Sequence, residues 1–431
     1  NILTKGTGNK SGGTIKQELG SFGKLRTSLG YNTGKLKNGW GLTLAGSYKQ
    51  GNGFVEETST QGFFYYTKIQ KELGDHILSF SLMGAPQKHG QRSYKSDIAT
   101  YDTSFARSLG DTSVFSNRIV NKGIQYNKHW GFLDRWSLNS NGDTLHSNET
   151  LNTKQNYYHK PQFSIRDFWS LDDNLYISNI IYASIGQGGG TSLSSGYNNV
   201  NELGLINLQS IYDNNVSFVD GLYSNENTKS TSILRSSINN HYWIGGLSTI
   251  NYRPNDFISL SGGIDYRSYK GEHYREVYDL LGGDYAIDES NELQLTQVKN
   301  VGDIVGYHND GLVKWIGGFG QVEYNNGRVS TFFNISGSNS GYSRHDYFKK
   351  KDLVLSDTTF TEVLGTSVAL LQDSIYISSL NPNGYHKTIS VDTFEYNGQK
   401  YTMNSPESRS AITDWKWIKG FTIKTGINYN I

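Results

Sequence analysis

Hydrophobic and polar residues alternate one by one along many segments of this chain. Near the end of the sequence, Phe421, Ile423 and Ile427 share one parity, whereas Lys424 and Asn428 share the other. Residues two apart on a β-strand point to the same face, so each such segment predicts a strand with one apolar and one polar face. The pattern predicts about twelve strands, at 13–20, 24–33, 39–50, 60–71, 75–85, 157–169, 174–186, 241–253, 257–270, 311–325, 328–340 and 415–431.

The connections between these strands fall into two length classes. The short ones are rich in Gly, Asn and Asp, and they lie at 34–39, 73–75, 171–174, 254–256 and 325–328. The long ones are polar and lie at about 86–157, 187–240, 270–310 and 340–412. From Leu73 onward the two classes alternate, so the tight turns gather at one end of the strands and the long loops at the other. A soluble sandwich also shows alternating strands, but this segregation favours an antiparallel up-and-down transmembrane β-barrel of the outer-membrane type.

Composition narrows the classes of protein further. The chain has 431 residues, of which 13% are aromatic, with 49 Gly and only 5 Pro, which suits an all-β protein with many turns. A net charge of +1 gives no electrostatic footprint for nucleic acid, so no nucleic-acid partner is predicted. The absence of cysteine excludes disulfides, thiol catalysis and zinc–thiolate sites. No apolar run approaches the length of a transmembrane helix.

Three segments resemble a known family. The opening residues Asn1, Ile2, Leu3, Thr4 and Lys5 resemble the tail of the plug domain in TonB-dependent outer-membrane receptors, where the first barrel strand follows at once. The segment 268–288, SYKGEHYREVYDLLGGDYAID, resembles a loop of the Bacteroidetes-type receptors, and 420–431, GFTIKTGINYNI, resembles one of their mid-barrel strands.

This resemblance implies a domain organisation. Residues 1–11 would be the plug tail and junction, and residues 12–431 a partial transmembrane barrel with long extracellular loops. Receptors of this family close with about twenty-two strands, so about twelve strands lead us to expect a fragment of a longer polypeptide, or pairing of the open edges with another chain.

The resemblance also implies a function, which is TonB-dependent uptake of a scarce ligand across the bacterial outer membrane. The ligand would be a siderophore, metal chelate, glycan or peptide. The implied partners are outer-membrane lipid, lipopolysaccharide, TonB through the missing plug region, and the small ligand. The alternative is a structural or docking barrel that holds surface lipoproteins or other envelope proteins. An outer-membrane enzyme is a third hypothesis, but no nucleophile motif occurs, so we expect no enzyme, no catalytic residue and no cofactor.

Two loop segments carry candidate ligand-binding residues. The segment HWGFLDRW places Trp130 and Trp136 in the longest loop, where exposed aromatic residues often bind ligands, although packing within the loop is the alternative. The segment YSRHDYFKKKD offers Arg344, His345 and Tyr347 for an anionic ligand, the alternative being a basic rim at the level of lipopolysaccharide. The histidines are scattered, and no metal site is predicted from them.

Overall fold

Twelve long strands form the main body of the molecule. The computed structural model describes residues 10–93, 95–111, 120–138, 140–368, 370–371, 374–375 and 389–430. The twelve strands, here called the barrel wall, are β1 (Gly12–Gly20), β2 (Lys24–Asn32), β3 (Trp40–Gly51), β4 (Thr60–Leu73), β5 (His76–Gly84), β10 (Gln162–Ser170), β11 (Leu175–Leu193), β12 (Leu234–Tyr252), β13 (Ile258–Asp279), β16 (Ile304–Asn325), β17 (Val329–Asp346) and β28 (Lys416–Tyr429).

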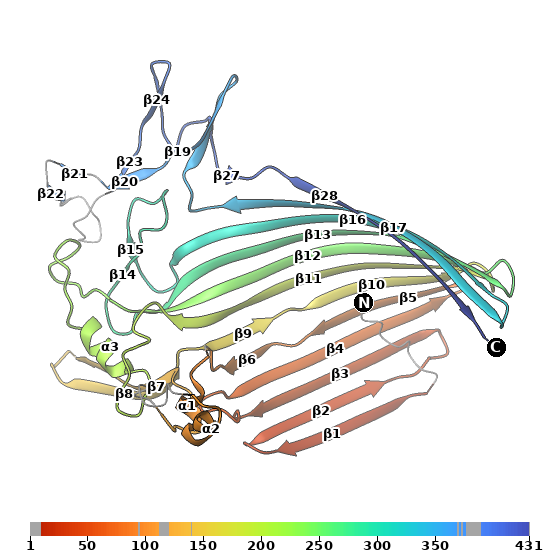
Figure 1. The fold of residues 1–431 in the computed structure, drawn as a ribbon, viewed down its shortest axis with the longest axis horizontal. Helices are drawn as coiled ribbons and strands as arrows, with labels where there is room; N and C mark the ends of the chain where they lie inside the picture. Colours follow the sequence, from red (N-terminus) through yellow and green to blue (C-terminus); the bar gives the residue numbers. More distant parts are fainter. Residues whose placement is uncertain are drawn as a thin grey trace.

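Every neighbouring pair in the barrel wall is antiparallel, and the strands follow one another in chain order from β1 to β28. The strands tilt together across one curved sheet (Figure 1). The tight turns lie at one end, and the helices, small sheets and long loops lie at the other (Figure 1). The up-and-down antiparallel wall predicted from the sequence is therefore confirmed.

The two faces of the barrel wall have opposite chemistry. The convex face carries large apolar residues that are open to the surroundings, with Ile264 68% and Ile181 61% exposed. Cross-strand pairs keep such residues on one face, as Tyr266 lies beside Ile316 and Leu260 beside Val322. The opposite, concave face carries polar side chains such as Lys68, which is only 4% exposed. An apolar outer band around a polar interior is what a barrel in lipid requires.

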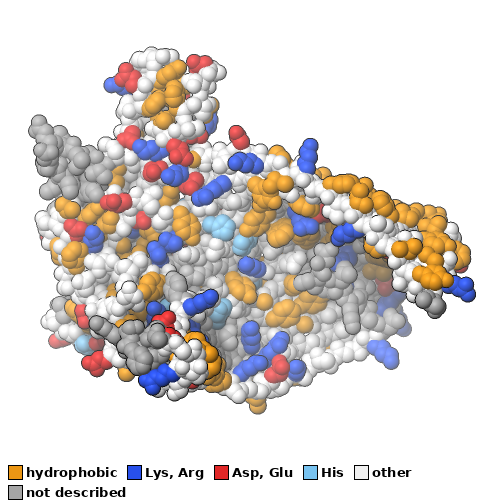
Figure 2. Space-filling view, viewed as in Figure 1, with side chains coloured by type: hydrophobic (Ala, Val, Ile, Leu, Met, Phe, Trp, Pro, Cys, Tyr) orange, Lys and Arg blue, Asp and Glu red, His pale blue; other side chains and the backbone are white. Residues whose placement is uncertain are grey.

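The concave face is visible as a hollow. In Figure 2 the side toward the viewer is hollowed, and Lys, Arg and His side chains lie within the hollow. Every alternation that the sequence predicted has its apolar parity on the convex face, as with Trp40, Leu42 and Leu44 on β3, paired with Lys71, Ile69 and Thr67 on β4. The described helices are all short, and none is long and apolar enough to cross a membrane.

One predicted strand is interrupted. The segment 157–169 forms two strands, β9 (Gln155–His159) and β10, with Lys160 and Pro161 between them. Proline has no backbone N–H to donate to a ladder. At this level the neighbour also changes, because β9 pairs with β6 (Gln87–Gly90) whereas β10 pairs with β5. Sequence alternation did not separate the two strands because the parity continues through the break.

Five strands extend further into the predicted loops than the alternation indicated. The bounds of β11, β12, β13, β16 and β17 add several residues on the loop side to the predicted segments. Polar residues dominate these extensions, so a pattern search stops where the apolar face ends. The ladder nevertheless continues, since backbone pairing such as Gly271 with Gly311 does not depend on an apolar partner.

The loops contain short elements of their own. These are α1 (Ile98–Tyr101), α2 (Thr103–Ser108), β7 (Trp130–Leu138), β8 (Thr144–Asn152), α3 (Leu208–Asn215), β14 (Ala286–Ile287), β15 (Val298–Lys299), β18 (Lys351–Val354), β19 (Thr359–Leu364), β20 (Thr366–Val368), β21 (Leu370–Leu371), β22 (Ser374–Ile375), β23 (Ile389–Val391), β24 (Phe394–Tyr396), β25 (Gln399–Tyr401), β26 (Ser408–Arg409) and β27 (Ala411–Ile412).

The buried apolar core lies among the loops and the loop ends of the wall strands. One cluster joins Leu133 of the β7–β8 hairpin to Ile211 on α3, Leu234 at the start of β12 and Leu281 after β13. Three loops that are distant in sequence therefore share one core. Arg135 reinforces it, with its guanidinium 2.5 Å from the carboxylate of Asp279.

Hydrogen bonds hold Arg135 in its charged form. Its guanidinium is 2.5 Å from the carboxylates of both Asp279 and Glu149. Although burial opposes the charge, the hydrogen bonds to Asp279 and Glu149 raise the pKa of Arg135. The ion pair with Asp279 connects the β7–β8 hairpin to the loop end of β13.

We expect Ile264→Arg to destabilise the barrel wall, because it places a charge in the middle of the lipid-facing band. The expected loss is about 2–4 kcal/mol in the free energy of unfolding from lipid vesicles. The matched control is Ser261→Lys on the same strand, whose side chain has the concave parity. An equal loss in both variants would contradict the assignment of the two faces.

We expect Asp279→Ala to loosen the β7–β8 hairpin by about 1–3 kcal/mol, because Arg135 then loses its more buried partner. Hydrogen exchange of the backbone amides of 130–138 should accelerate accordingly. Glu149→Ala, which removes the more exposed partner of Arg135, should cost less than about 1 kcal/mol. The reverse order would show that Asp279 does not anchor the hairpin.

Candidate ligand-binding site on the concave face

A pocket of about 690 Å³ lies on the concave face of the barrel wall, toward the loop end. We call it the lumen pocket. Its lining comes from five adjacent wall strands and the residue before Pro161, and consists of Lys160, Gln162, Tyr182, Ser184, His241, Trp243, Arg267, Tyr269, Val313 and Trp315.

Strand register brings these side chains together. One rung of the sheet aligns Ser184, Trp243, Tyr269 and Val313 on four successive strands. Two residues closer to the tight turns, a second rung aligns Gly245 on β12, Arg267 on β13 and Trp315 on β16. Residues on neighbouring rungs of equal parity share a face, so two rungs build a continuous aromatic surface.

Gly245 makes room for one of the aromatic side chains. A Cβ placed there would lie 2.4 Å from the hydroxyl oxygen of Tyr182 and 2.9 Å from the carbonyl oxygen of Tyr266. Only a residue without a side chain lets the Tyr182 phenol lie across the neighbouring strand. The glycine therefore shapes the floor of the lumen pocket.

The charges in the lumen pocket are arranged around one carboxylate. Asp265 lies 2.8 Å from the guanidinium of Arg267 and accepts a hydrogen bond of 3.0 Å from the indole N–H of Trp315. The Arg267 guanidinium also lies 5.5 Å from the centre of the Trp315 ring. Asp265 thus fixes the side chains of Arg267 and Trp315 and offsets the positive charge of Arg267. Lys160 adds a second positive charge to the lumen pocket.

The other side of the lumen pocket is a set of ring contacts. The hydroxyl of Tyr269 is 2.5 Å from Nδ1 of His241. The Trp243 ring meets the Tyr269 ring edge to face, with centroids 5.8 Å apart. Trp243 remains 40% exposed, so its ring is open to a ligand. Exposed indole faces bind planar groups, and neighbouring cations bind anionic ones.

The predicted loop tryptophans lie away from the lumen pocket. The Trp136 ring packs against the loop core, and its N–H donates to Asp213 at 3.3 Å. Trp130 is half-buried, and its ring meets that of Phe132 edge to face at 5.3 Å. Packing within the loop, which the sequence left open as the alternative, describes Trp136 well.

The second predicted group is divided between the two faces of β17. Arg344 has the concave parity and pairs with Asp346 at 3.1 Å. His345 has the convex parity, and its ring lies 3.9 Å from that of Tyr347, which stacks in turn on His308 at 4.3 Å. The structure brings His345 and Tyr347 together and separates them from Arg344.

The predicted plug tail, Asn1, Ile2, Leu3, Thr4 and Lys5, lies outside the described residues. Sequence reasoning did not single out the lumen pocket, although a signal was present. Trp243, Arg267, Tyr269 and Trp315 occupy positions of polar parity in their strands, where most neighbours are small or hydrophilic. Large aromatic residues on a lumen face are the exception that marks a candidate site.

Comparison with known proteins supports the fold. No known protein-family profile matches the chain, and no curated protein sequence does either. Crystal structures of the ferric-catecholate import receptor Fiu from E. coli K12 are similar in fold. The closed form has a TM-score of 0.56 at 10% identity, and the match covers 100% of this chain and 50% of the receptor. The open form has a TM-score of 0.55 at 10% identity, and the match covers 99% of this chain and 53% of the receptor. The unliganded ferric citrate transporter FecA has a TM-score of 0.48 at 8% identity, and the match covers 80% of this chain and 40% of the transporter.

The chain therefore spans about half the length of the Fiu receptor. At this level of identity the likeness concerns the fold, which is that of an outer-membrane β-barrel wall. It agrees with the apolar convex face and confirms the predicted fold class. The Fiu structures are of an import receptor.

We expect Asp265→Asn to expose the positive charge of Arg267 beside Trp315, since the amide still accepts from the indole but no longer neutralises the guanidinium. Quenching of tryptophan fluorescence by iodide should increase, whereas quenching by uncharged acrylamide should not. The increase should vanish when Trp315→Phe is added. If iodide and acrylamide quenching rise together, the substitution has opened the pocket without changing its charge.

Proposed function

We propose that this chain forms part of the wall of a TonB-dependent outer-membrane receptor, and that the receptor imports an anionic metal chelate. The observation that carries the proposal is the lumen pocket, an aromatic surface with two cationic side chains on the concave face. A ligand that travels through a barrel must meet this face and cannot meet the lipid-facing one.

The chemistry of the lining favours one ligand class among those that the sequence left open. Lys160 attracts negative charge, whereas Asp265 offsets the charge of Arg267, and the rings of Trp243 and Trp315 offer flat apolar contact. Ferric chelates with aromatic or carboxylate donors combine negative charge with planar groups. A neutral glycan would use the rings but not the cations. The likeness in fold to a ferric-catecholate import receptor supports the same class.

The proposal includes the domain organisation inferred from the resemblance. Residues 1–11 would follow a plug that contacts TonB, and residues 12–431 would be one portion of a larger barrel. The first and last wall strands support this, because β1 is paired with β2 and β28 with β17 at the ends of the described sheet. Unpaired strand edges in lipid are strongly unfavourable, so further strands would pair with both.

The test is iron uptake by bacteria that carry the full-length protein as their only receptor of this type. The probes are radiolabelled iron complexed with a tris-catecholate chelator, with a hydroxamate chelator or with citrate. We expect uptake of at least one chelate, and its loss when TonB is deleted. Trp243→Ala and Arg267→Ala should each lower uptake about tenfold or more, because aromatic and Arg anchors dominate binding energy.

The matched control is Lys314→Ala, since Lys314 lies next to Trp315 on β16 but has the convex parity. Its uptake should equal that of the unchanged protein. Uptake that persists without TonB would contradict active transport. Absence of uptake together with stable co-purification of a surface lipoprotein would favour the docking-barrel alternative.

A further inference from the structure

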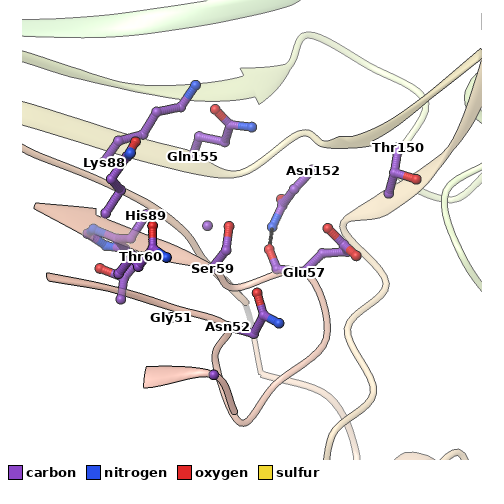
Figure 3. A pocket seen from close by; sticks show the side chains of 14 residues that line it. Gly51, Asn52, Glu57, Ser59, Thr60, Lys88, His89, Thr150, Asn152 and Gln155 are labelled. Carbon is purple, nitrogen blue, oxygen red and sulfur yellow. Dashed lines mark hydrogen bonds between the residues drawn. The ribbon is translucent and has the colours of Figure 1, made fainter. Parts of the chain in front are cut away.

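A second pocket lies at the loop end of the barrel wall, away from the lumen pocket. It has a volume of about 570 Å³, and we call it the rim pocket. Its lining consists of Gly23, Gln50, Gly51, Asn52, Glu57, Ser59, Thr60, Gln61, Lys88, His89, Gly90, Thr150, Asn152 and Gln155. Figure 3 shows these side chains around one opening, contributed by the β3–β4 connection, by β6 and by the segment from β8 to β9.

The rim pocket shares no lining residue with the lumen pocket, and part of its lining has the opposite, convex parity. Gln50 lies beside Gln61, and Gln61 beside Lys88, across three strands. Gln50 is two residues from Tyr48, which belongs to the convex face together with its partner Phe63. These three polar side chains therefore continue the convex face beyond its apolar band, toward the loops.

The lining has one kind of chemistry. Apart from its glycines, every lining residue is polar, and amide and hydroxyl side chains predominate. Amides and hydroxyls both donate and accept hydrogen bonds. The charged groups, Glu57 and Lys88, offset each other. Apart from the imidazole of His89, no aromatic or aliphatic side chain belongs to the lining, in contrast to the lumen pocket.

Part of this hydrogen-bonding capacity is used to build the pocket. Asn152 donates from its amide to the carbonyl oxygen of Glu57 at 2.6 Å and accepts from the backbone of Lys154 at 2.7 Å. Figure 3 shows the first of these contacts. Gln61 donates to the hydroxyl of Tyr48 at 2.7 Å, and that hydroxyl donates to Gln50 at 3.0 Å. These bonds fix the walls.

The rest of the capacity faces the opening. Within the part of the chain that the structure describes, the side chains of Asn52, Ser59, Lys88 and Gln155 have no hydrogen-bond partner. They come from three segments that are far apart in the sequence. An opening ringed by preplaced donors and acceptors suits a ligand with many hydroxyl groups.

The backbone at the rim pocket is strained. Glu57 has a φ of 52°, in the left-handed region that residues with a side chain rarely adopt. A Cβ at Gly90 would lie 2.2 Å from the carbonyl oxygen of Glu57. The end of β6 therefore approaches the β3–β4 connection so closely that no side chain fits between them. Strain of this kind costs about 1–3 kcal/mol and persists where the surrounding structure enforces it, often at binding sites.

We propose that the rim pocket is a binding site for a saccharide, separate from the import pathway. The ligand is a polyhydroxylated, essentially uncharged sugar segment of two or three residues. It has two sources, the core oligosaccharide of lipopolysaccharide in the same leaflet and a free oligosaccharide outside the cell. The two share the hydroxyl groups that the amide and hydroxyl lining would recognise.

The test is binding to the purified full-length protein in a detergent without a sugar headgroup, because a maltoside would occupy the site. The probes are core oligosaccharide released from lipopolysaccharide by mild acid, and neutral oligosaccharides of glucose and of mannose. We expect saturation-transfer NMR to detect at least one of them. Asn52→Ala combined with Gln155→Ala should weaken its affinity about tenfold or more, because two hydrogen bonds are lost.

Trp243→Ala in the lumen pocket is the control, and its affinity for the saccharide should equal that of the unchanged protein. Binding of core oligosaccharide alone, or of a free oligosaccharide, supports the site and identifies its source. Failure of every probe to bind the unchanged protein at about 10 mM overturns the proposal. So does loss of binding in Trp243→Ala but not in the rim variant, which would place the sugar in the lumen.

The rim variant also separates this proposal from the proposed import function. Iron-chelate uptake should be unchanged by Asn52→Ala and Gln155→Ala, since both residues lie outside the lumen pocket. For folding, both variants should keep the heat-modifiable electrophoretic mobility of an intact barrel. If chelate uptake fails in the unchanged protein, saccharide binding at the rim is still open to the same measurement.

Discussion

The structure depends on one continuous ladder of backbone hydrogen bonds from β1 to β28. In lipid no water is present to satisfy an unpaired N–H or C=O group, so the strands must pair along their whole length. A slip of one residue would turn every side chain of a strand to the other face. The long pairings of β12, β13 and β16 show no slip along the apolar part of the wall. The separation into an apolar convex face and a polar concave face follows from this register.

Lipid around the barrel wall and water around the loops favour opposite placements of apolar side chains. In the barrel wall the large apolar side chains, such as Ile264, point outward and stay uncovered by protein. Among the loops Leu133, Leu234 and Leu281 are buried, as in a water-soluble domain. At the loop ends of β11, β12 and β13, exposed apolar side chains are replaced by buried ones. Arg135 and Asp279 form an ion pair at this transition.

The two pockets follow from the same geometry. The lumen pocket is built from side chains of concave parity on neighbouring rungs, and its aromatic rings and cations suit an anionic, planar chelate. The rim pocket forms where the wall strands end and the connections begin, and it is lined with amides and hydroxyls. Its lining shares no residue with that of the lumen pocket. One wall therefore presents two pockets of different chemistry.

The sequence by itself determined the strands, their two faces and the separation of tight turns from long loops. Alternation is a local property, and each strand records the two environments it faces, as at Leu42 and Thr43. It could not determine the break at Pro161, because the parity runs on through it. Nor could it determine either pocket. Trp243 and Arg267 are distant in sequence and line one pocket only through the register of β12 and β13. Arg344 and His345 are adjacent in sequence, yet the pleat places them on opposite faces.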